Sequence, residues 1–356
     1  MSSKYKKESI KCLKRKILYA RIQLREYFER RFAIMKLSVL TNLFGDLSLE
    51  EALVKFEKLG IEAVEIGCGG FPGKAHCDPK ILLNDDLALK EWLDTVKRHG
   101  MEICALSCHG NPVHPDKAQA EAFHNDFVDA VLLAEKIGID TVITFSGCPG
   151  GSAEDKTPNW VTCPWPDDFL AVLDYQWNEV LIPYWKKTAE FAKAHGVTKI
   201  AFEMHPGFCV YNPETLLKLR AAVGDVIGAN FDPSHLIWQG IDPVAAIREL
   251  EGAIYHFHAK DTKVDKYNTA KFGVLDTKHY GDEIHRSWIF RSVGYGNGLD
   301  YWRDMISNLR LVGYDKVMSI EHEDSLMTPD EGLKHAVDFL KESMIRDPKP
   351  TGMSWA

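Results

Sequence analysis

The sequence predicts an α/β protein, a single (β/α)8 TIM barrel with a basic helical extension at its N-terminus. Two observations support this prediction. From residue 36 onward, short apolar runs alternate with amphipathic stretches, and repeated strand-then-helix units are typical of a parallel sheet. Eight such runs are present, and eight units predict a sheet that closes into a barrel.

The predicted strands are short apolar runs bounded by turn-forming residues. They span residues 36–41, 62–67, 102–107, 141–146, 199–204, 226–231, 254–258 and 316–321. Helical spacing of apolar residues predicts helices between them, at 48–58, 87–99, 117–137, 167–195, 213–223 and 243–250. Most of these helical stretches are followed by a glycine, the usual residue after a helix C-terminus, as at Gly60, Gly100, Gly138, Gly196, Gly224 and Gly313.

The domain organisation follows from length and composition. A chain of 356 residues with 45% hydrophobic content can bury one large core, and no internal repeat or low-complexity linker divides it. We therefore expect one catalytic barrel domain over 36–345, an extension over 1–35 and a tail over 346–356. A membrane-spanning helix would need an apolar run of about 18 residues, and the sequence has none.

Charge is unevenly distributed along the chain. Residues 1–36 hold twelve Lys or Arg and three Glu, a balance of +9, which leaves −17 for the rest because the total is −8. An acidic body repels phosphate backbones, so no nucleic-acid partner is expected. The spacing of apolar residues over 8–32 predicts a basic amphipathic helix that contacts a membrane surface or an acidic partner. The favoured alternative is an appendage outside the fold or an upstream start, since Met35 directly precedes the first strand.

Cysteine usage indicates the cellular compartment. The eight cysteines form no Cys-x-x-Cys pair, and no apolar leader with a small-residue cleavage site precedes the fold. Reduced thiols in the cytoplasm are therefore the expectation.

Two long segments interrupt the strand-helix alternation. Residues 147–165 are rich in Gly, Pro, Ser and Asn, and residues 261–299 mix polar and aromatic side chains without helical spacing. Both follow the C-terminal end of a predicted strand, where barrel enzymes build their sites, so both are expected to be functional loops.

Four consecutive strand units end in side chains that bind metal ions, namely Glu203, Asp232, His258 and Glu321. Side chains alternate along a strand, so these residues can point into the barrel mouth while their apolar neighbours point outward. Taken singly, each is more often a cap, a turn former or a hydrogen-bonded core residue. Together they suggest one divalent cation, because buried charges need compensation. An oxygen-rich set suits Mn²⁺, Mg²⁺ or Co²⁺, with Zn²⁺ as another option.

Five motifs extend this pattern, and they are Phe202-Glu-Met-His, Asp232-Pro-Ser-His, His256-Phe-His-Ala-Lys-Asp261, Arg291-Ser-Val-Gly-Tyr-Gly296 and Ser319-Ile-Glu-His-Glu-Asp324. In combination they resemble the sugar phosphate isomerase/epimerase family of the xylose isomerase-like TIM barrel superfamily, over about residues 36–345. The resemblance implies that the metal is held by Glu203, Asp232, His258 and Glu321. It further implies that His235 and Arg291 contact the substrate.

The chemistry that needs these residue types is proton transfer next to a carbonyl. A divalent cation stabilises the enediolate, while one carboxylate takes the proton and another returns it. The resemblance to ketose epimerases implies that Glu203 and Glu321 serve as acid/base residues as well as ligands. We therefore expect a divalent-metal-dependent isomerase or epimerase of a sugar or sugar phosphate, active in carbohydrate metabolism, with isomerisation and epimerisation both open.

Several further residues are weaker candidates, each with a structural alternative. Substrate contacts are expected from His109, His205 and Lys260, and Glu65 can also reach the substrate. Asp261 can orient ligands, and the amides of Gly294, Gly296 and Gly298 can face a phosphate, although a flexible turn is favoured. Trp160 and Trp165 can stack on a sugar or simply close the barrel mouth.

Three alternative functions stay open at this point. The same enediolate can expel a neighbouring hydroxyl, which would give a dehydratase or lyase acting on an oxidised sugar or inositol. A relative of endonuclease IV would use three zinc ions at abasic DNA, and a non-catalytic barrel would only bind sugar. The expected partner is a small-molecule sugar, and assembly into a homo-oligomer is left open.

Overall fold

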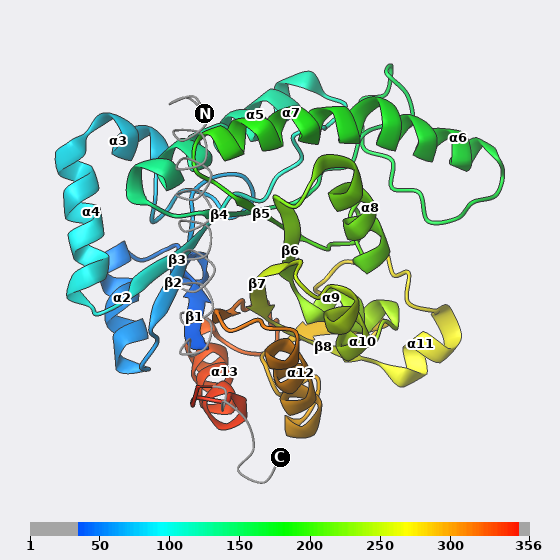
Figure 1. Cartoon of the computed structure of the whole chain (residues 1–356). Coiled ribbons are helices and arrows are strands. Elements are labelled where there is room, and N and C mark those ends of the chain that lie inside the picture. Colours follow the sequence, from blue (N-terminus) through cyan, green and yellow to red (C-terminus); the bar gives the residue numbers. More distant parts are fainter. Residues whose placement is uncertain (1–34, 349–356) are drawn as a thin grey trace, which may run out of the picture. The chain divides into compact units, whose positions relative to one another are not determined.

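Eight parallel strands close into a barrel in the computed structural model, which describes residues 35–348 (Figure 1). Around the ring the strands follow the order β1, β10, β7, β6, β5, β4, β3 and β2, and β2 pairs with β1 to close it. The predicted (β/α)8 fold is thereby confirmed. Residues from Lys36 to Met344 form one compact unit. The predicted basic helix lies outside the described residues.

The barrel strands agree with the sequence prediction to within two residues at each end. Their bounds are β1 Lys36–Leu40, β2 Ala63–Gly67, β3 Glu102–Ser107, β4 Thr141–Thr144, β5 Lys199–Glu203, β6 Ile227–Phe231, β7 Ile254–Ala259 and β10 Val317–Ile320. The apolar runs were sufficient to place them because a buried parallel strand is nearly continuous in hydrophobic residues.

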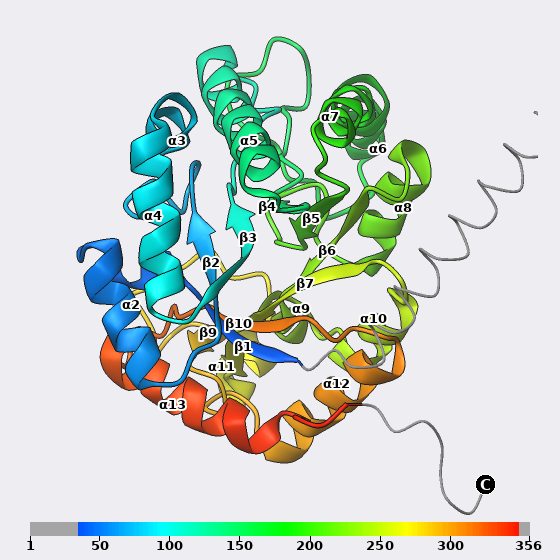
Figure 2. The same ribbon diagram turned by 60° about the vertical axis from the view of Figure 1, so that its left-hand side comes forward.

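Helices form the outer layer around the strands (Figure 2). Their bounds are η1 Thr41–Phe44, α2 Leu49–Lys58, α3 Pro79–Asn84, α4 Asp86–Arg98, α5 Lys117–Ile137, α6 Asp168–Asp174, the π-helical η2 Tyr175–Leu181, α7 Ile182–Ala194, α8 Pro213–Val223, α9 Pro233–Gln239, α10 Pro243–Glu249, α11 Lys266–Phe272, α12 Leu299–Leu311 and α13 Pro329–Ser343. None of the described helices is long and apolar enough to cross a membrane.

Local sequence explains where the helices begin and end. Ser48 and Glu51 form a reciprocal capping box at the start of α2, which satisfies amides that the first helical turn leaves free. Gly138 ends α5 in the left-handed conformation with φ 78°, which a residue with a Cβ adopts only at a cost.

The segment 261–299 differs from its prediction as an irregular loop. Two parts of this segment form an antiparallel pair, β8 Asp261–Val264 with β9 Trp288–Arg291, and α11 lies between the two strands in the chain. The sequence also did not predict α9, which begins directly after Asp232. The Asp232 side chain accepts a hydrogen bond from the Ser234 amide, so the Asp-Pro pair starts a helix here.

The two faces of the strands separate apolar from polar residues. Phe202 and Phe257 face outward, where their rings meet Trp185 of α7 and Trp302 of α12 at centroid distances of 4.5 and 6.5 Å. Inside the barrel, a small apolar cluster of Ala105, Ile143 and Ala201 is fully buried. Polar side chains occupy the strand positions that follow, at the C-terminal face.

Trp185 tests this packing. It is fully buried between Phe127 and Phe202, and its indole Nε1 donates to the Ser146 carbonyl at 2.8 Å. We expect Trp185→Ala to lower the free energy of unfolding by about 3–5 kcal/mol, since a large buried ring leaves a cavity. Chemical denaturation followed by circular dichroism measures this change. The matched variant Trp165→Ala, at a residue that is 74% exposed, should leave stability almost unchanged. Equal stabilities of the two variants would contradict the packing described here.

Candidate metal and substrate site

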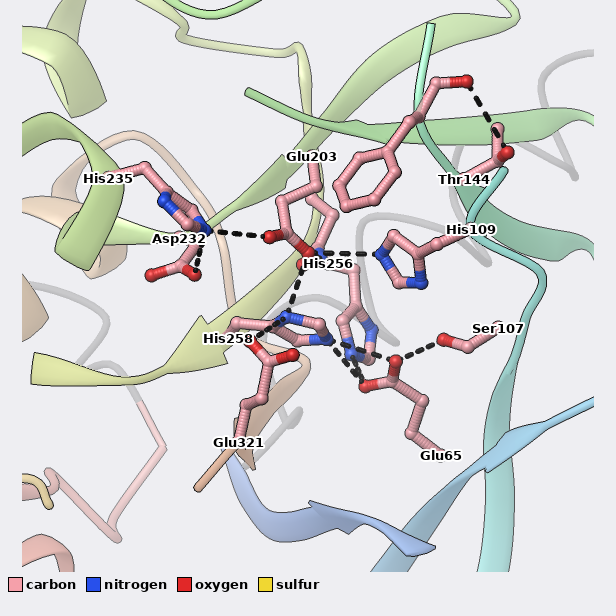
Figure 3. A network of polar contacts seen from close by, with 12 residues as sticks. Glu65, Ser107, His109, Thr144, Glu203, Asp232, His235, His256, His258 and Glu321 are labelled. Carbon is pink, nitrogen blue, oxygen red and sulfur yellow. Dashed lines mark hydrogen bonds and ion pairs between the residues drawn. The ribbon is translucent and has the colours of Figure 1, made fainter. Parts of the chain in front are cut away.

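Strand register brings the four predicted ligands to one place (Figure 3). Glu203 ends β5 and Asp232 directly follows β6, while His258 lies in β7 and Glu321 directly follows β10. In the neighbouring pairs, Glu203 lies opposite Asn230 and Ser319 opposite His258. Because the strands are parallel, their C-terminal ends meet at one rim of the barrel, and the four side chains converge there.

The separation of the four side chains fits a single ion. Each offers one ligand atom, and these atoms all lie within 4.8 Å of one another. Opposite ligands around a cation with bonds of about 2.1 Å lie about 4 Å apart, which is close to this arrangement. The Nδ1 atom of His258 lies 3.2 Å from Glu203 Oε2 and 3.1 Å from Glu321 Oε2.

The hydrogen-bonding state of these atoms supports the fit to a cation. Asp232 Oδ2, His258 Nδ1 and Glu321 Oε2 are buried, and none has a hydrogen-bond partner among the described residues. Their mutual contacts lack hydrogen-bond geometry even where the distances are short. The Lys260 ammonium forms ion pairs with two of these atoms, Asp232 Oδ2 and Glu321 Oε2, and one cation at the common centre would satisfy all three.

Glu203 is held in place by donors on both of its oxygens. His109 Nε2 and Asn230 Nδ2 donate to Oε2 at 3.0 and 3.1 Å, and His235 Nε2 donates to Oε1 at 3.0 Å. Burial raises the pKa of Glu203, but the hydrogen bonds from His109 and His235 outweigh it and hold that pKa well below its usual value. Glu203 is therefore a charged and rigidly oriented carboxylate.

Glu65 fixes the orientation of His258 from inside the barrel. The His258 Nε2 atom lies 3.0 Å from both Glu65 oxygens, and His256 Nε2 donates to the same carboxylate at 2.8 Å. Ser107 and Ser319 also donate to it. With Nε2 occupied in this way, His258 presents Nδ1 to the ligand cluster.

Glu65, His256 and His258 also lie close enough together to hold an ion. Both Glu65 oxygens are already hydrogen-bonded, however, whereas the other group has unsatisfied ligand atoms. We therefore treat Glu203, Asp232, His258 and Glu321 as the candidate metal site. Glu65 is 0% exposed and its oxygens are engaged by these partners, so the structure replaces its suggested substrate contact with an orienting one.

Lys260 provides positive charge beside the four side chains. Its buried Nζ lies 3.1 Å from Asp232 Oδ2, 2.7 Å from Glu321 Oε2 and 3.0 Å from Glu323 Oε2. Burial lowers the pKa of Lys260, but the surrounding carboxylates raise it well above its usual value, so Lys260 is an ammonium ion. Burial also favours neutral Asp232, yet the Lys260 charge lowers the pKa of Asp232 to about 2. Lys260 thus offsets part of the negative charge of the cluster.

His205 and His235 link the cluster to a neighbouring cavity of about 360 Å³, which both rings line. Their ring centroids are 4.1 Å apart. Burial lowers the pKa of His205 to about 3, which keeps that ring neutral. Burial also disfavours charge on His235, but the Asp232 carboxylate outweighs it and raises the pKa of His235 to about 9. A substrate can therefore meet a neutral ring at His205 and a positively charged ring at His235.

Arg291 lies apart from these contacts. Its Nε donates to Asp324 Oδ2 at 2.9 Å, and its guanidinium lies 5.4 Å from the Tyr295 ring centroid. The structure thus pairs Arg291 with an aspartate that is not one of the four ligands. Its contact with substrate stays a prediction.

Asp261 anchors the glycine-containing loop after β9. Its Oδ2 accepts hydrogen bonds from the amides of Gly294, Gly296 and Asn297 at 3.1, 3.1 and 2.9 Å, and from the indole of Trp302. A Cβ on Gly296 would collide with this carboxylate. The amides at 294 and 296, suggested as phosphate donors, are used within the protein, and Asp261 has a structural role.

Sequence reasoning missed several residues of the site. Asn230 and His256 lie two positions before Asp232 and His258, and strand alternation puts them on the same strand faces, but the sequence indicated no role for either. Trp238, Tyr280 and Trp288 also line the cavity, but they come from α9 and from the segment 261–299, whose structures the sequence did not indicate. Of the two predicted tryptophans, Trp160 lines this cavity and Trp165 does not.

Fold and site together define a barrel protein with its polar site at the C-terminal rim of the strands. The chain belongs to the xylose isomerase-like TIM barrel family, whose model matches residues 53–343.

Relatives and solved structures agree with this assignment. The uncharacterized protein YfiH of Bacillus subtilis (strain 168) is 41% identical over 313 residues, which cover 87% of this chain and 99% of YfiH. An inosose dehydratase of Mesomycoplasma hyopneumoniae (strain J) is 24% identical, over 85% of this chain and 91% of the dehydratase.

Two solved structures have the same fold. The IolI protein with a binding zinc atom superimposes with a TM-score of 0.58 at 18% identity, covering 87% of this chain and 99% of IolI. A D-psicose 3-epimerase crystallised in the presence of D-fructose superimposes with a TM-score of 0.55 at 14% identity, covering 87% of this chain and 99% of the epimerase.

Glu65 provides a test of the geometry. We expect Glu65→Gln to weaken Mn²⁺ binding by about 10–100-fold, because His258 loses the charged acceptor that orients it. Isothermal titration with Mn²⁺ measures the affinity, and one ion per chain is expected. The surface variant Glu179→Gln is the matched control and should bind like the unmodified protein. Unchanged affinity in Glu65→Gln, at full folding by circular dichroism, would show that Glu65 does not support the ligand.

Proposed function

We propose that this protein is a divalent-metal-dependent enzyme that moves a proton next to the carbonyl of a polyhydroxylated ketone, as a sugar epimerase or isomerase. The observation that carries the proposal is the convergence of Glu203, Asp232, His258 and Glu321, each of which offers a ligand atom within 4.8 Å of the others at the rim of the barrel.

The four side chains would hold the cation. When bound, such a cation polarises the substrate carbonyl and stabilises the negative charge that develops on its oxygen. A donor set of three carboxylates and one imidazole suits Mn²⁺, Mg²⁺ or Co²⁺ and also accepts Zn²⁺. The zinc atom in the IolI structure supports a divalent metal in this family, although that likeness alone concerns the fold.

Glu203 and Glu321 are placed to act as the acid/base pair. In the barrel order, β5 and β10 are separated by β6 and β7, and the two carboxylates lie 3.2 and 3.1 Å from the His258 Nδ1 atom between them. A proton removed by one carboxylate and returned by the other arrives on the opposite face of the carbon, which inverts its configuration. Return of the proton to the neighbouring carbon would give isomerisation instead.

The two glutamates differ in their surroundings. Glu203 is saturated with hydrogen-bond donors, whereas the Glu321 side chain is 16% exposed and lies beside the Lys260 ammonium. Glu321 also lines a second cleft, so a proton can pass between it and the substrate or solvent more readily. We therefore infer that the Glu321 carboxylate exchanges protons with substrate or solvent more readily, whereas the Glu203 carboxylate keeps a fixed orientation.

A second candidate is dehydration of an oxidised sugar or inositol. Loss of a hydroxyl next to the enediolate requires a donor at the departing oxygen, and Lys260 is a cationic donor within 2.7 to 3.1 Å of two candidate ligands. The similarity to an inosose dehydratase supports dehydration, and the similarity to the D-psicose 3-epimerase structure supports epimerisation.

Solvent-deuterium incorporation tests the step that both outcomes share. With Mn²⁺ added, we expect deuterium at the carbon next to the carbonyl of at least one free ketose or inosose, detected by mass spectrometry and NMR. Glu203→Gln and Glu321→Gln should each reduce exchange by about 10²-fold or more, because each removes a proton acceptor. Glu179→Gln is the matched surface control and should exchange at the unmodified rate.

The outcomes separate the alternatives. An altered configuration indicates an epimerase, a moved carbonyl an isomerase, and loss of water a dehydratase. Three zinc ions per chain with cleavage of abasic DNA would instead support the nuclease. Sugar binding that survives both glutamine substitutions, with no exchange in any ketose, would contradict an enzymatic role.

A further inference from the structure

Exposed apolar side chains gather on two segments of the chain, residues 162–174 and 265–284, which we call the rim segments. Among the described residues, fifteen large apolar side chains are exposed, and eight of them belong to the rim segments. These eight are Trp165, Phe169, Leu170, Tyr267, Phe272, Leu275, Tyr280 and Ile284. Single apolar residues are normal on a protein surface, but their concentration in two short segments indicates an interaction surface.

The rim segments lie at the same end of the barrel. The first follows β4 and contains α6, and the second lies between β8 and β9 and contains α11. Thr162 from the first segment and Leu275 and Tyr280 from the second line the same cavity of about 360 Å³. Both α6 and α11 lie at the right-hand edge of the molecule in Figure 1. A single partner can therefore contact both segments at once.

Neither helix of the rim segments has a fully buried residue. α6 forms about the first two turns of a helix that continues through η2 into α7, and these turns lie at its outer end (Figure 1). α11 is only seven residues long, and so short a helix in water depends on packing for its stability. Within the described part of the chain, the outward faces of α6 and α11 have no packing partner.

Charge distinguishes the two helices. Asp167, Asp168 and Asp174 lie at the ends of α6, and no Lys or Arg lies within ten residues of any of them along the chain. α11 instead carries Lys266 and Lys271 and no acidic residue. No described residue forms an ion pair with Asp167 or Asp168, nor with either lysine of α11. One chain thus presents an acidic helix and a basic helix at one end of the barrel, both beside exposed apolar side chains.

We infer that this protein forms a two-fold dimer in which α6 of one copy packs against α11 of the other. A two-fold interface requires a surface that is complementary to itself, and an acidic and a basic helix on one chain meet that requirement, since the axis forms the contact twice. The apolar side chains supply affinity, and the opposite charges decide which helix meets which.

The size of the surface is adequate for such a dimer. Twenty-three residues of the rim segments are exposed. An interface of standard size uses about 20–30 residues of each partner. A second copy here also borders the mouth of the cavity, because Leu275 and Tyr280 line that cavity and are 61% and 53% exposed. The inference concerns assembly and does not depend on the proposed function.

The mass of the full chain in solution tests the inference. Sedimentation equilibrium over a range of protein concentrations should show a species of twice the 40.3 kDa chain mass. Leu170→Glu and Phe272→Glu should each weaken dimerisation by at least about tenfold, because each places a charge in the apolar part of the contact. Both residues are exposed, so circular dichroism should show unchanged folding. Lys97→Glu, at an exposed residue of α4 on the opposite side of the molecule in Figure 1, is the control and should dimerise normally.

Charge reversal tests which helices meet. The double variant Asp167→Lys, Asp168→Lys makes α6 basic, and the double variant Lys266→Glu, Lys271→Glu makes α11 acidic. Each should dimerise at least about tenfold more weakly at low salt, since like charges then face each other in both contacts. An equimolar mixture of the two double variants should form a heterodimer, because each contact again pairs a basic helix with an acidic one.

The outcomes decide the inference in either direction. A protein that is monomeric at every concentration, or a dimer that none of the α6 and α11 variants weakens, overturns it. Folded double variants that separate alone and do not combine on mixing overturn the pairing of α6 with α11. If circular dichroism shows that a double variant misfolds, Leu170→Glu and Phe272→Glu decide instead.

Discussion

The burial of three carboxylates and an imidazole at one rim of the barrel is the constraint on which the site depends. Like charges this close repel strongly in a medium from which water is excluded, so the fold must supply positive charge or donors around them. Lys260 supplies one positive charge, and His109, Asn230 and His235 supply donors to Glu203. A divalent cation would add positive charge at the point where the three carboxylates and the His258 Nδ1 atom meet.

The barrel supports this site from two directions. Below it, Glu65 joins β2 to β7 and β10 through His256, His258 and Ser319, so the orientation of one candidate ligand depends on strands across the ring. Beside it, Asp261 gathers the amides of the loop after β9 and sets the path of that loop at the rim.

The sequence was sufficient for the strands and for the four converging residues, because each lies at the end of a buried run and parallel strands end at a common rim. The sequence was insufficient for the elements and pairings that depend on tertiary contacts. The β8–β9 pair and α9 carry weak local signals, so the aromatic wall of Trp238 and Trp288 was not foreseen. Arg291 pairs with Asp324 and Glu65 with two histidines, and no spacing in the sequence reveals partners so distant along the chain.

A crystal of the protein soaked in Mn²⁺ tests the central claim most directly. Anomalous diffraction should show one strong peak at the barrel rim, within about 2.0–2.4 Å of ligand atoms from Glu203, Asp232, His258 and Glu321. Glu65 should remain hydrogen-bonded to His258 without contacting the ion. A peak between Glu65, His256 and His258 instead would contradict the account. The absence of any ion at saturating Mn²⁺, with the Lys260 ammonium alone facing the carboxylates, would also contradict it.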